Sequence, residues 1–114
     1  MTRLLVDDED VAEVTVAASW AARARGMLGR RTLPESMWFV RVPSVHGVGM
    51  TQPLDVAQLD AAGAVLAVHV LRPFGLVRPR RGAVDVLEAP AGSFARWGLR
   101  PGSVVRRTPD GATG

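Results

Sequence analysis

The stretch "LDVAQLDAAGAVLAVHVL", residues 54–71, decides the fold, because it has the pattern of two strands joined by a tight turn. Residues 54–60 and 64–71 are apolar runs of strand length. Asp60 stands where a turn begins, and Gly63 stands where a positive φ is needed. The stretch therefore predicts an antiparallel hairpin.

More strands are predicted on both sides of the hairpin. Residues 11–16 alternate in character, and "MWFVRV", residues 37–42, is a dense run of β-formers. After the hairpin, "AVDVLEA", residues 83–89, resumes the strand pattern. The pair Pro101-Gly102 then predicts a turn before a last strand. So many short strands in one chain indicate a mainly β protein.

Two short helices and one loop complete the predicted elements. "SWAARARGMLGR", residues 19–30, begins with a capping serine and places apolar side chains at helical spacing. "SFARWG", residues 93–98, ends on a glycine that can close a helix. Residues 72–82 are rich in Pro, Gly and Arg and predict a mobile loop. The predicted fold is mainly β (α+β), a small, strongly curved antiparallel sheet or open β-barrel with two short helices.

The chain of 114 residues has the size of one domain. We divide it into an N-terminal acidic segment, residues 1–10, a globular domain, residues 11–107, and a flexible tail, residues 108–114. The first apolar run is too short for a signal peptide, and no run approaches the roughly 20 residues of a spanning helix. A soluble, cytoplasmic protein without membrane contact is expected.

Composition narrows the possible chemistry. The chain has no cysteine, which excludes disulfides, thiolate catalysis and Cys-based metal sites. The 14 basic residues are all arginine, and the net charge is only +3, which is ordinary for a small domain. A solvated arginine surface that reflects coding bias is the simpler interpretation. The alternative is nucleic-acid binding through Arg78, Arg80, Arg81, Arg106 and Arg107, against which the lack of interleaved aromatic residues argues.

A candidate site lies just before the hairpin. "SVHGVGMTQPLD", residues 44–55, combines a histidine, a methionine and an aspartate with glycines that permit a close approach to the backbone. We predict a groove whose ligand-binding residues are Trp38, His46, Met50 and Asp55, with the loop at 72–82 as a possible lid. The leading hypothesis is a non-catalytic binding module for a small molecule or a peptide.

Each of these residues also has a simpler interpretation. Asp55 can be a general base or ligand anchor, or a structural acceptor for backbone N–H groups or an arginine. His46 can be catalytic or merely hydrogen-bonded, and His69 is interpreted as structural or exposed. A small hydrolase with His46 and Asp55 as an acid–base pair is the alternative function. No metal-ligand spacing, Gly-x-Ser-x-Gly elbow or phosphate loop is present, so no metal or cofactor is expected.

Three motifs resemble a known family. "RARGMLGR-TLP", "SVHGVGMTQPLDVAQLDAAGAVLAV" and "VLEAPAGSFARWGLRPGSVV" are similar, in this order, to the signatures of the bacterial and archaeal domain-of-unknown-function family 192. The resemblance covers about residues 14–105 and implies a compact, mainly β fold, with no established activity. The chain departs from the family pattern at Thr51-Gln52, at Gln58 in place of an aromatic residue, and at Ser103 in place of an acidic one. Structural roles are expected for Gly26, Asp60, Gly63, Glu88, Gly92 and Gly102.

Overall fold

The computed structural model describes residues 1–17, 34–42, 45–46 and 52–109. The strands lie in a three-stranded sheet of order β10-β1-β2, a five-stranded sheet of order β3-β4-β9-β6-β7, and a ribbon of β5 and β8. The elements are β1 (Thr2–Val6), β2 (Glu9–Glu13), β3 (Thr15–Ala17), β4 (Met37–Phe39), β5 (Val45–His46), β6 (Leu54–Leu59), β7 (Val65–Leu71), β8 (Leu76–Val77), β9 (Asp85–Pro90), α2 (Ser93–Trp97) and β10 (Val105–Pro109).

The predicted hairpin is confirmed as β6 and β7, which pair antiparallel. The Asp60 carboxylate closes the turn, since its Oδ1 accepts the backbone N–H of Ala62 at 2.9 Å and of Ala64 at 2.8 Å. Gly63 has φ +85°, the left-handed conformation that its place in the turn requires. Both residues therefore have the structural roles that the sequence indicates.

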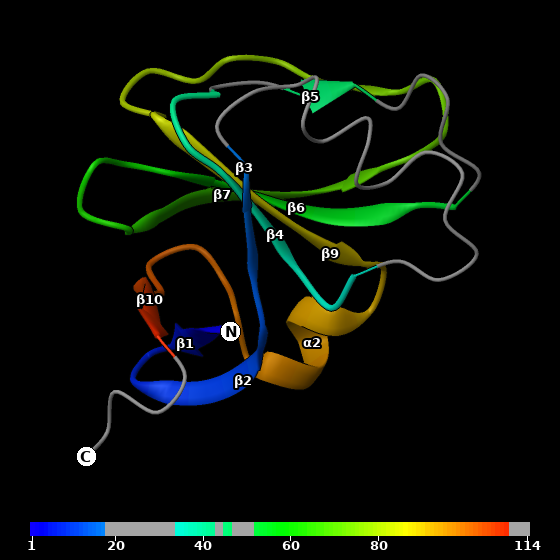
Figure 1. Cartoon of the computed structure of the whole chain (residues 1–114). Coiled ribbons are helices and arrows are strands. Elements are labelled where there is room, and N and C mark those ends of the chain that lie inside the picture. Colours follow the sequence, from blue (N-terminus) through cyan, green and yellow to red (C-terminus); the bar gives the residue numbers. More distant parts are fainter. Residues whose placement is uncertain (18–33, 43–44, 47–51, 110–114) are drawn as a thin grey trace.

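The five-stranded sheet lies between two layers (Figure 1). The three-stranded sheet and α2 lie on one side of it, and the β5–β8 ribbon lies on the other. β3 and β7 are its two outer strands, and no pairing joins them within the described residues, so the described strands form an open sheet and not a closed barrel. β3 pairs with β4 in parallel, whereas a purely antiparallel sheet was expected.

The N-terminal segment belongs to the folded domain. β1 pairs with β2 and with β10, although residues 1–10 were expected to lie outside the domain. The reason is the alternation in β1, which buries Leu4 and Val6 in the core. Asp7 and Asp8 then form a two-residue turn with φ +49° and +72°, a conformation that aspartate tolerates. At the other end, β10 reaches Pro109, into the expected tail.

Apolar residues fill both faces of the central sheet. The face toward the three-stranded sheet and α2 carries one cluster: Leu4, Val6, Val14, Trp38, Ala57, Leu59, Val65, Leu87, Ala89, Phe94, Leu99 and Val105. The opposite face carries the other: Ala17, Met37, Phe39, Val45, Leu54, Val56, Leu71, Val77 and Val86. Because successive side chains on a strand point to opposite faces, each inner strand contributes to both clusters. Because both faces of these strands are buried, their sequences are mostly apolar and do not alternate between polar and apolar residues.

The later predictions are partly confirmed. α2 matches the predicted helix at 93–98 and is capped by Gly98. The other predicted helix, residues 19–30 with Gly26, lies outside the described residues. Residues 72–82, predicted as a mobile loop, contain β8, which pairs with β5.

Candidate functional site

Asp55 is a buried acceptor for the helix α2. Its Oδ2 accepts the backbone N–H of Gly92 and of Phe94, each at 3.0 Å. Phe94 is in the first turn of α2, where N–H groups have no partner within the helix. A capping residue normally precedes its helix, but here the carboxylate comes from β6. These contacts correspond to the structural alternative for Asp55.

Trp38 is also held on the inside of the fold. Its ring belongs to the core, and its Nε1–H donates to Asp85 Oδ2 at 2.9 Å. The other carboxylate oxygen of Asp85 accepts the backbone N–H of Arg41 at 2.9 Å. The Arg107 guanidinium lies 4.7 Å from the centre of the ring. Trp38 therefore ties β4 to β9 and to β10 and leaves only 4 % of its surface exposed.

The four predicted ligand-binding residues are not brought together around one hollow by the described part of the structure. Trp38 and Asp55 face the layer that contains α2, through the core cluster and the cap described above. β5, the strand that carries His46, lies on the other side of the central sheet (Figure 1). Met50 lies outside the described residues. An acid–base pair of His46 and Asp55 is not supported by this arrangement.

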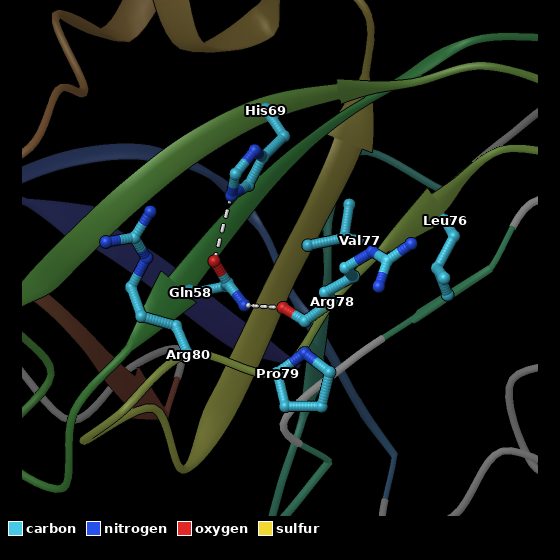
Figure 2. Close-up of a pocket in the computed structure, with 7 residues that line it drawn as sticks. All are labelled: Gln58, His69, Leu76, Val77, Arg78, Pro79 and Arg80. Carbon is cyan, nitrogen blue, oxygen red and sulfur yellow. Dashed lines mark hydrogen bonds between the residues drawn. The ribbon is translucent and has the colours of Figure 1, made fainter.

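A different cleft opens on the β8 side of the central sheet (Figure 2). Its volume is about 340 Å³, the size of a small-molecule site. It is lined by Gln58, His69, Leu76, Val77, Arg78, Pro79 and Arg80, and we call it the Gln58–His69 cleft. Figure 2 shows the Gln58 side chain at its centre, with Arg78 and Arg80 on either side.

The Gln58 amide fixes the floor of this cleft. Gln58 is only 1 % exposed, and its Nε2–H donates to the carbonyl oxygen of Arg78 at 2.7 Å. Because a carbonyl can only accept, this bond sets the orientation of the amide. Gln58 Oε1 then accepts from His69 Nε2 at 2.8 Å, which places the proton of the neutral imidazole on Nε2. His69 Nδ1 is consequently the acceptor of the ring.

Burial and charge both favour a neutral His69. Desolvation lowers the pKa of His69 below its ordinary value of 6.5, and the nearby Arg80 guanidinium lowers it further. At neutral pH the side chain is therefore uncharged, and it can donate from one nitrogen and accept at the other. The positive charge of the cleft comes from Arg78 and Arg80.

We expect the titration of His69 to report on Arg80. In wild type, its pKa should lie below 6.5, and the Arg80→Ala variant should raise it. A folded-state pKa below the unfolded one means that the unfolded chain binds more protons, so stability falls as pH drops from 6.5 toward the folded-state pKa. NMR titration of the imidazole C–H signals measures this pKa. Arg81→Ala is the control, and equal shifts in both variants would contradict a specific effect of Arg80.

A second hollow, of about 310 Å³, lies near α2 and is lined by Val11, Ala12, Glu35, Pro90, Ser93, Arg96 and Trp97. Its charged groups are occupied by neighbours, since Glu35 Oε2 accepts the backbone N–H of Glu13 at 3.2 Å and Arg96 Nη2 donates to Ser93 Oγ at 3.1 Å. The opposite charges of Glu35 and Arg96 also compensate each other. This hollow therefore has a weaker preference for one class of ligand than the Gln58–His69 cleft.

The other structural residues lie where the motifs indicate. Gly92 precedes α2 with φ +95° and donates its N–H to Asp55, and Gly102, with φ +94°, donates its N–H to the carbonyl of Val65 at 2.9 Å. Glu88 is 1 % exposed in the middle of β9. Its structural role remains a prediction.

Sequence reasoning missed the centre of the cleft. His69 was interpreted as structural or exposed, and Gln58 was noted only as a departure from the family pattern. The available signal was Gln58 itself, because a polar side chain stands in a strand whose two faces are otherwise almost entirely apolar. Arg78 and Arg80 were identified, but only for nucleic-acid binding.

Two negative observations apply to the described residues alone. Their histidines, aspartates and glutamates form no group of three or more that could hold a metal ion. Among the same residues, no helix has the length and apolar character needed to cross a bilayer.

The fold and the cleft define a small, mainly β domain of layered sheets with a basic cleft at one edge. The chain belongs to family DUF192, described as "Uncharacterized ACR, COG1430", whose profile matches residues 3–107. No curated protein matches it.

Two solved structures share the fold. One is a protein of unknown function from Novosphingobium aromaticivorans, with 22 % identity and a TM-score of 0.74 over 92 % of this chain and 82 % of that chain. The other, described as a "putative transcription regulator", is from Sinorhizobium meliloti, with 24 % identity and a TM-score of 0.74 over 93 % of this chain and 91 % of that chain.

Proposed function

We propose that the protein is a non-catalytic binding module whose site is the Gln58–His69 cleft. The proposed ligand is a small molecule that carries a carboxylate or phosphate group. The observation that carries this proposal is the buried Gln58 amide, held between the His69 ring and the Arg78 carbonyl. Burying a polar amide costs free energy unless hydrogen bonds satisfy it, and here two hydrogen bonds also fix its orientation. A polar group in a fixed orientation is what the specific recognition of a ligand requires.

The charge of the cleft supports an anionic ligand. The seven lining residues that belong to the described part of the chain include two arginines and no aspartate or glutamate. Guanidinium groups bind carboxylates and phosphates through paired hydrogen bonds. Leu76, Val77 and Pro79 provide an apolar wall for the rest of the molecule. This mixture of a few polar groups with apolar surface is typical of small-molecule sites.

The absence of catalysis is part of the proposal. Among the residues that the structure describes, those that line the cleft offer no hydroxyl, thiol or carboxylate that could act as a nucleophile beside His69. The cleft is not the groove predicted around residues 46–55, because its described lining residues include none of Trp38, His46 and Asp55. Only the class of function, a binding module for a small molecule, is retained from that hypothesis.

The nucleic-acid alternative has less support. Arg106 forms an ion pair with Asp8, and Arg107 lies over the Trp38 ring. Both come from β10 in the three-stranded sheet, whereas Arg78, Arg80 and Arg81 follow β8 in the opposite layer. These five arginines therefore belong to two layers and not to one strand or one loop.

We expect acetate, succinate and inorganic phosphate to shift NMR signals of the Gln58 side-chain amide and His69, with at least one of the three binding in the millimolar range or tighter. Arg80→Ala should weaken that binding about tenfold, which corresponds to about 1.4 kcal/mol for one charge-assisted contact. Ligand charge should also raise the pKa of His69, since a nearby anion favours the imidazolium.

Arg81→Ala is the matched control, because Arg81 lies beside Arg80 in the sequence and does not line the cleft. If both variants weaken binding equally, the anions respond to general charge and the proposed site is rejected. Absence of any shift at Gln58 and His69 with all three anions would reject it as well.

A further inference from the structure

The turn after β7 contains an aromatic residue, Phe74, in an unfavourable backbone conformation and in an exposed position. The Gly75 N–H donates to the Arg72 carbonyl at 2.8 Å, which closes a β-turn with Pro73 and Phe74 at its centre. Phe74 has φ +63° in the third position, where a type II turn favours glycine. Its side chain is also 78 % exposed. Neither backbone conformation nor burial accounts for a phenylalanine here.

β7 beside this turn is an outer strand with an open edge. Its first residue, Val65, is covered there, because its backbone N–H and C=O bond to Ser103 and Gly102. From residue 66 to residue 71, the described part of the chain supplies no backbone hydrogen bonds except those with β6. Such an edge offers a row of donors and acceptors to another extended chain.

The part of the chain that contains β7 and the turn after it has exposed apolar residues and a positive charge. Val70 and Leu76 are each 59 % exposed, on either side of Phe74 in the sequence. Residues 61–84 contain four arginines, Arg72, Arg78, Arg80 and Arg81, and no acidic residue. A partner with negative charge and aliphatic side chains is complementary to this composition.

We propose that the outer edge of β7 and Phe74 form a docking surface for an extended, acidic segment of another protein. The segment pairs with residues 66–71 as an additional strand, packs an aliphatic side chain on Phe74, and sets its carboxylates against the arginines. Strand addition is an established mode of peptide recognition. This surface goes beyond the anion cleft and does not depend on a ligand there.

Other occupants satisfy fewer of these features. An anionic bilayer could accept Phe74 and the arginines, but it offers no partners to the backbone groups of an open strand edge. A second copy of this chain would bring the same four arginines face to face, which repels. Only a peptide chain of opposite charge satisfies backbone, apolar and charged groups together.

The test uses an array of immobilised octapeptides that alternate Glu, Gln or Lys with Val, Leu or Phe. The Glu series should bind the protein at least tenfold more tightly than the Lys series. A matched Glu peptide with N-methyl groups on every amide should not bind, since neither of its edges can donate hydrogen bonds to β7. Amide NMR signals of residues 66–71 should shift with the unmodified peptide only.

Phe74→Gly removes the docking side chain and relieves the positive φ, so its thermal midpoint should equal or exceed that of wild type while peptide affinity falls at least tenfold. Val16→Ala, an exposed valine on the opposite outer strand β3, is the control and should bind peptides as wild type does. Binding of succinate or phosphate in the Gln58–His69 cleft should be unchanged in Phe74→Gly, which separates the two sites.

Three results would overturn the proposal. The first is equal binding of Glu and Lys peptides, or of N-methylated and unmodified ones, and the second is full peptide affinity in Phe74→Gly. The third is binding to phosphatidylglycerol vesicles, dependent on Phe74, without binding to any peptide, which would assign the surface to a membrane. Absence of binding to both peptides and vesicles would equally reject a docking function.

Discussion

Replacing Asp55 with alanine is expected to destabilise the fold by about 3 kcal/mol, because two backbone N–H groups lose their charged acceptor. The N–H groups belong to Gly92 and Phe94, and Asp55 itself is 7 % exposed, so water cannot easily replace the carboxylate. For a domain of this size, the loss corresponds to a drop of roughly 10 °C in the thermal midpoint. Chemical denaturation and calorimetry measure both quantities.

The Asp55→Asn variant refines this test, since an amide keeps one acceptor oxygen without its charge, and an intermediate loss is expected. Asp10→Asn is the control, because Asp10 forms an exposed ion pair with Arg3 at 2.8 Å, a type of contact that contributes little. In Asp55→Ala, the amides of Gly92 and Phe94 should exchange hydrogen faster. Unchanged exchange at both would mean that the carboxylate does not cap α2.

Gly63→Ala is the second substitution with a large expected effect, again about 3 kcal/mol. Alanine at φ +85° costs about 1–2 kcal/mol in backbone strain. Its Cβ would also overlap the carbonyl oxygen of Val105, and that backbone cannot move without disturbing the hydrogen bond from Val105 N–H to the Gly63 carbonyl. Overpacking of this kind adds about 1–3 kcal/mol.

Gly82→Ala separates the two contributions. Gly82 has φ +84°, almost the same backbone conformation, but its nearest neighbour to an added Cβ is the Leu66 side chain at 3.7 Å, an ordinary contact. Only the conformational part, about 1–2 kcal/mol, is therefore expected for Gly82→Ala. If the free energy of unfolding falls by the same amount in both variants, the close approach of the β6–β7 turn to β10 adds nothing to the cost of the Gly63→Ala substitution.

The parts of the fold that sequence predicts well are those with local causes. The β6–β7 hairpin depends on Asp60 and Gly63, whose roles follow from turn chemistry within four residues. α2 likewise follows from the short pattern at 93–98 and its closing Gly98. Here the local pattern and the final structure agree, as in most native elements.

The parts of the fold that could not be predicted from sequence depend on contacts between distant segments of the chain. The placement of β1 depends on β10, whose register partner for Leu4 is Arg107, about a hundred residues away along the chain. Acidic residues at 7–10 obscured a strand whose inward side chains are Leu4 and Val6. No local pattern reports which strand pairs with which over such a separation.

The Asp55 cap and the Gln58–His69 cleft were even harder to predict from sequence, because both are formed by contacts between different segments of the chain. Asp55 caps α2 by accepting the N–H of Gly92, which is 37 residues further along the chain, a separation that strand periodicity does not encode. Gln58 and His69 meet diagonally across the hairpin, because Gln58 lies opposite Ala67 and His69 is the next residue on the same face of β7. Arg78 then joins them through its carbonyl, which any residue type would provide. Side-chain identity alone could not indicate this cluster.

The central position of β1 in its sheet has a consequence for biosynthesis. Its neighbours are β2, which leaves the ribosome early, and β10, which emerges after every other strand that the structure describes. Because synthesis proceeds at about 5–20 residues per second, several seconds or longer pass between the synthesis of β1 and β2 and that of β10. During this delay Leu4 and Val6 have no Val105 to cover them, so chaperones can bind the nascent hairpin, and the sheet closes only after translation has passed residue 105.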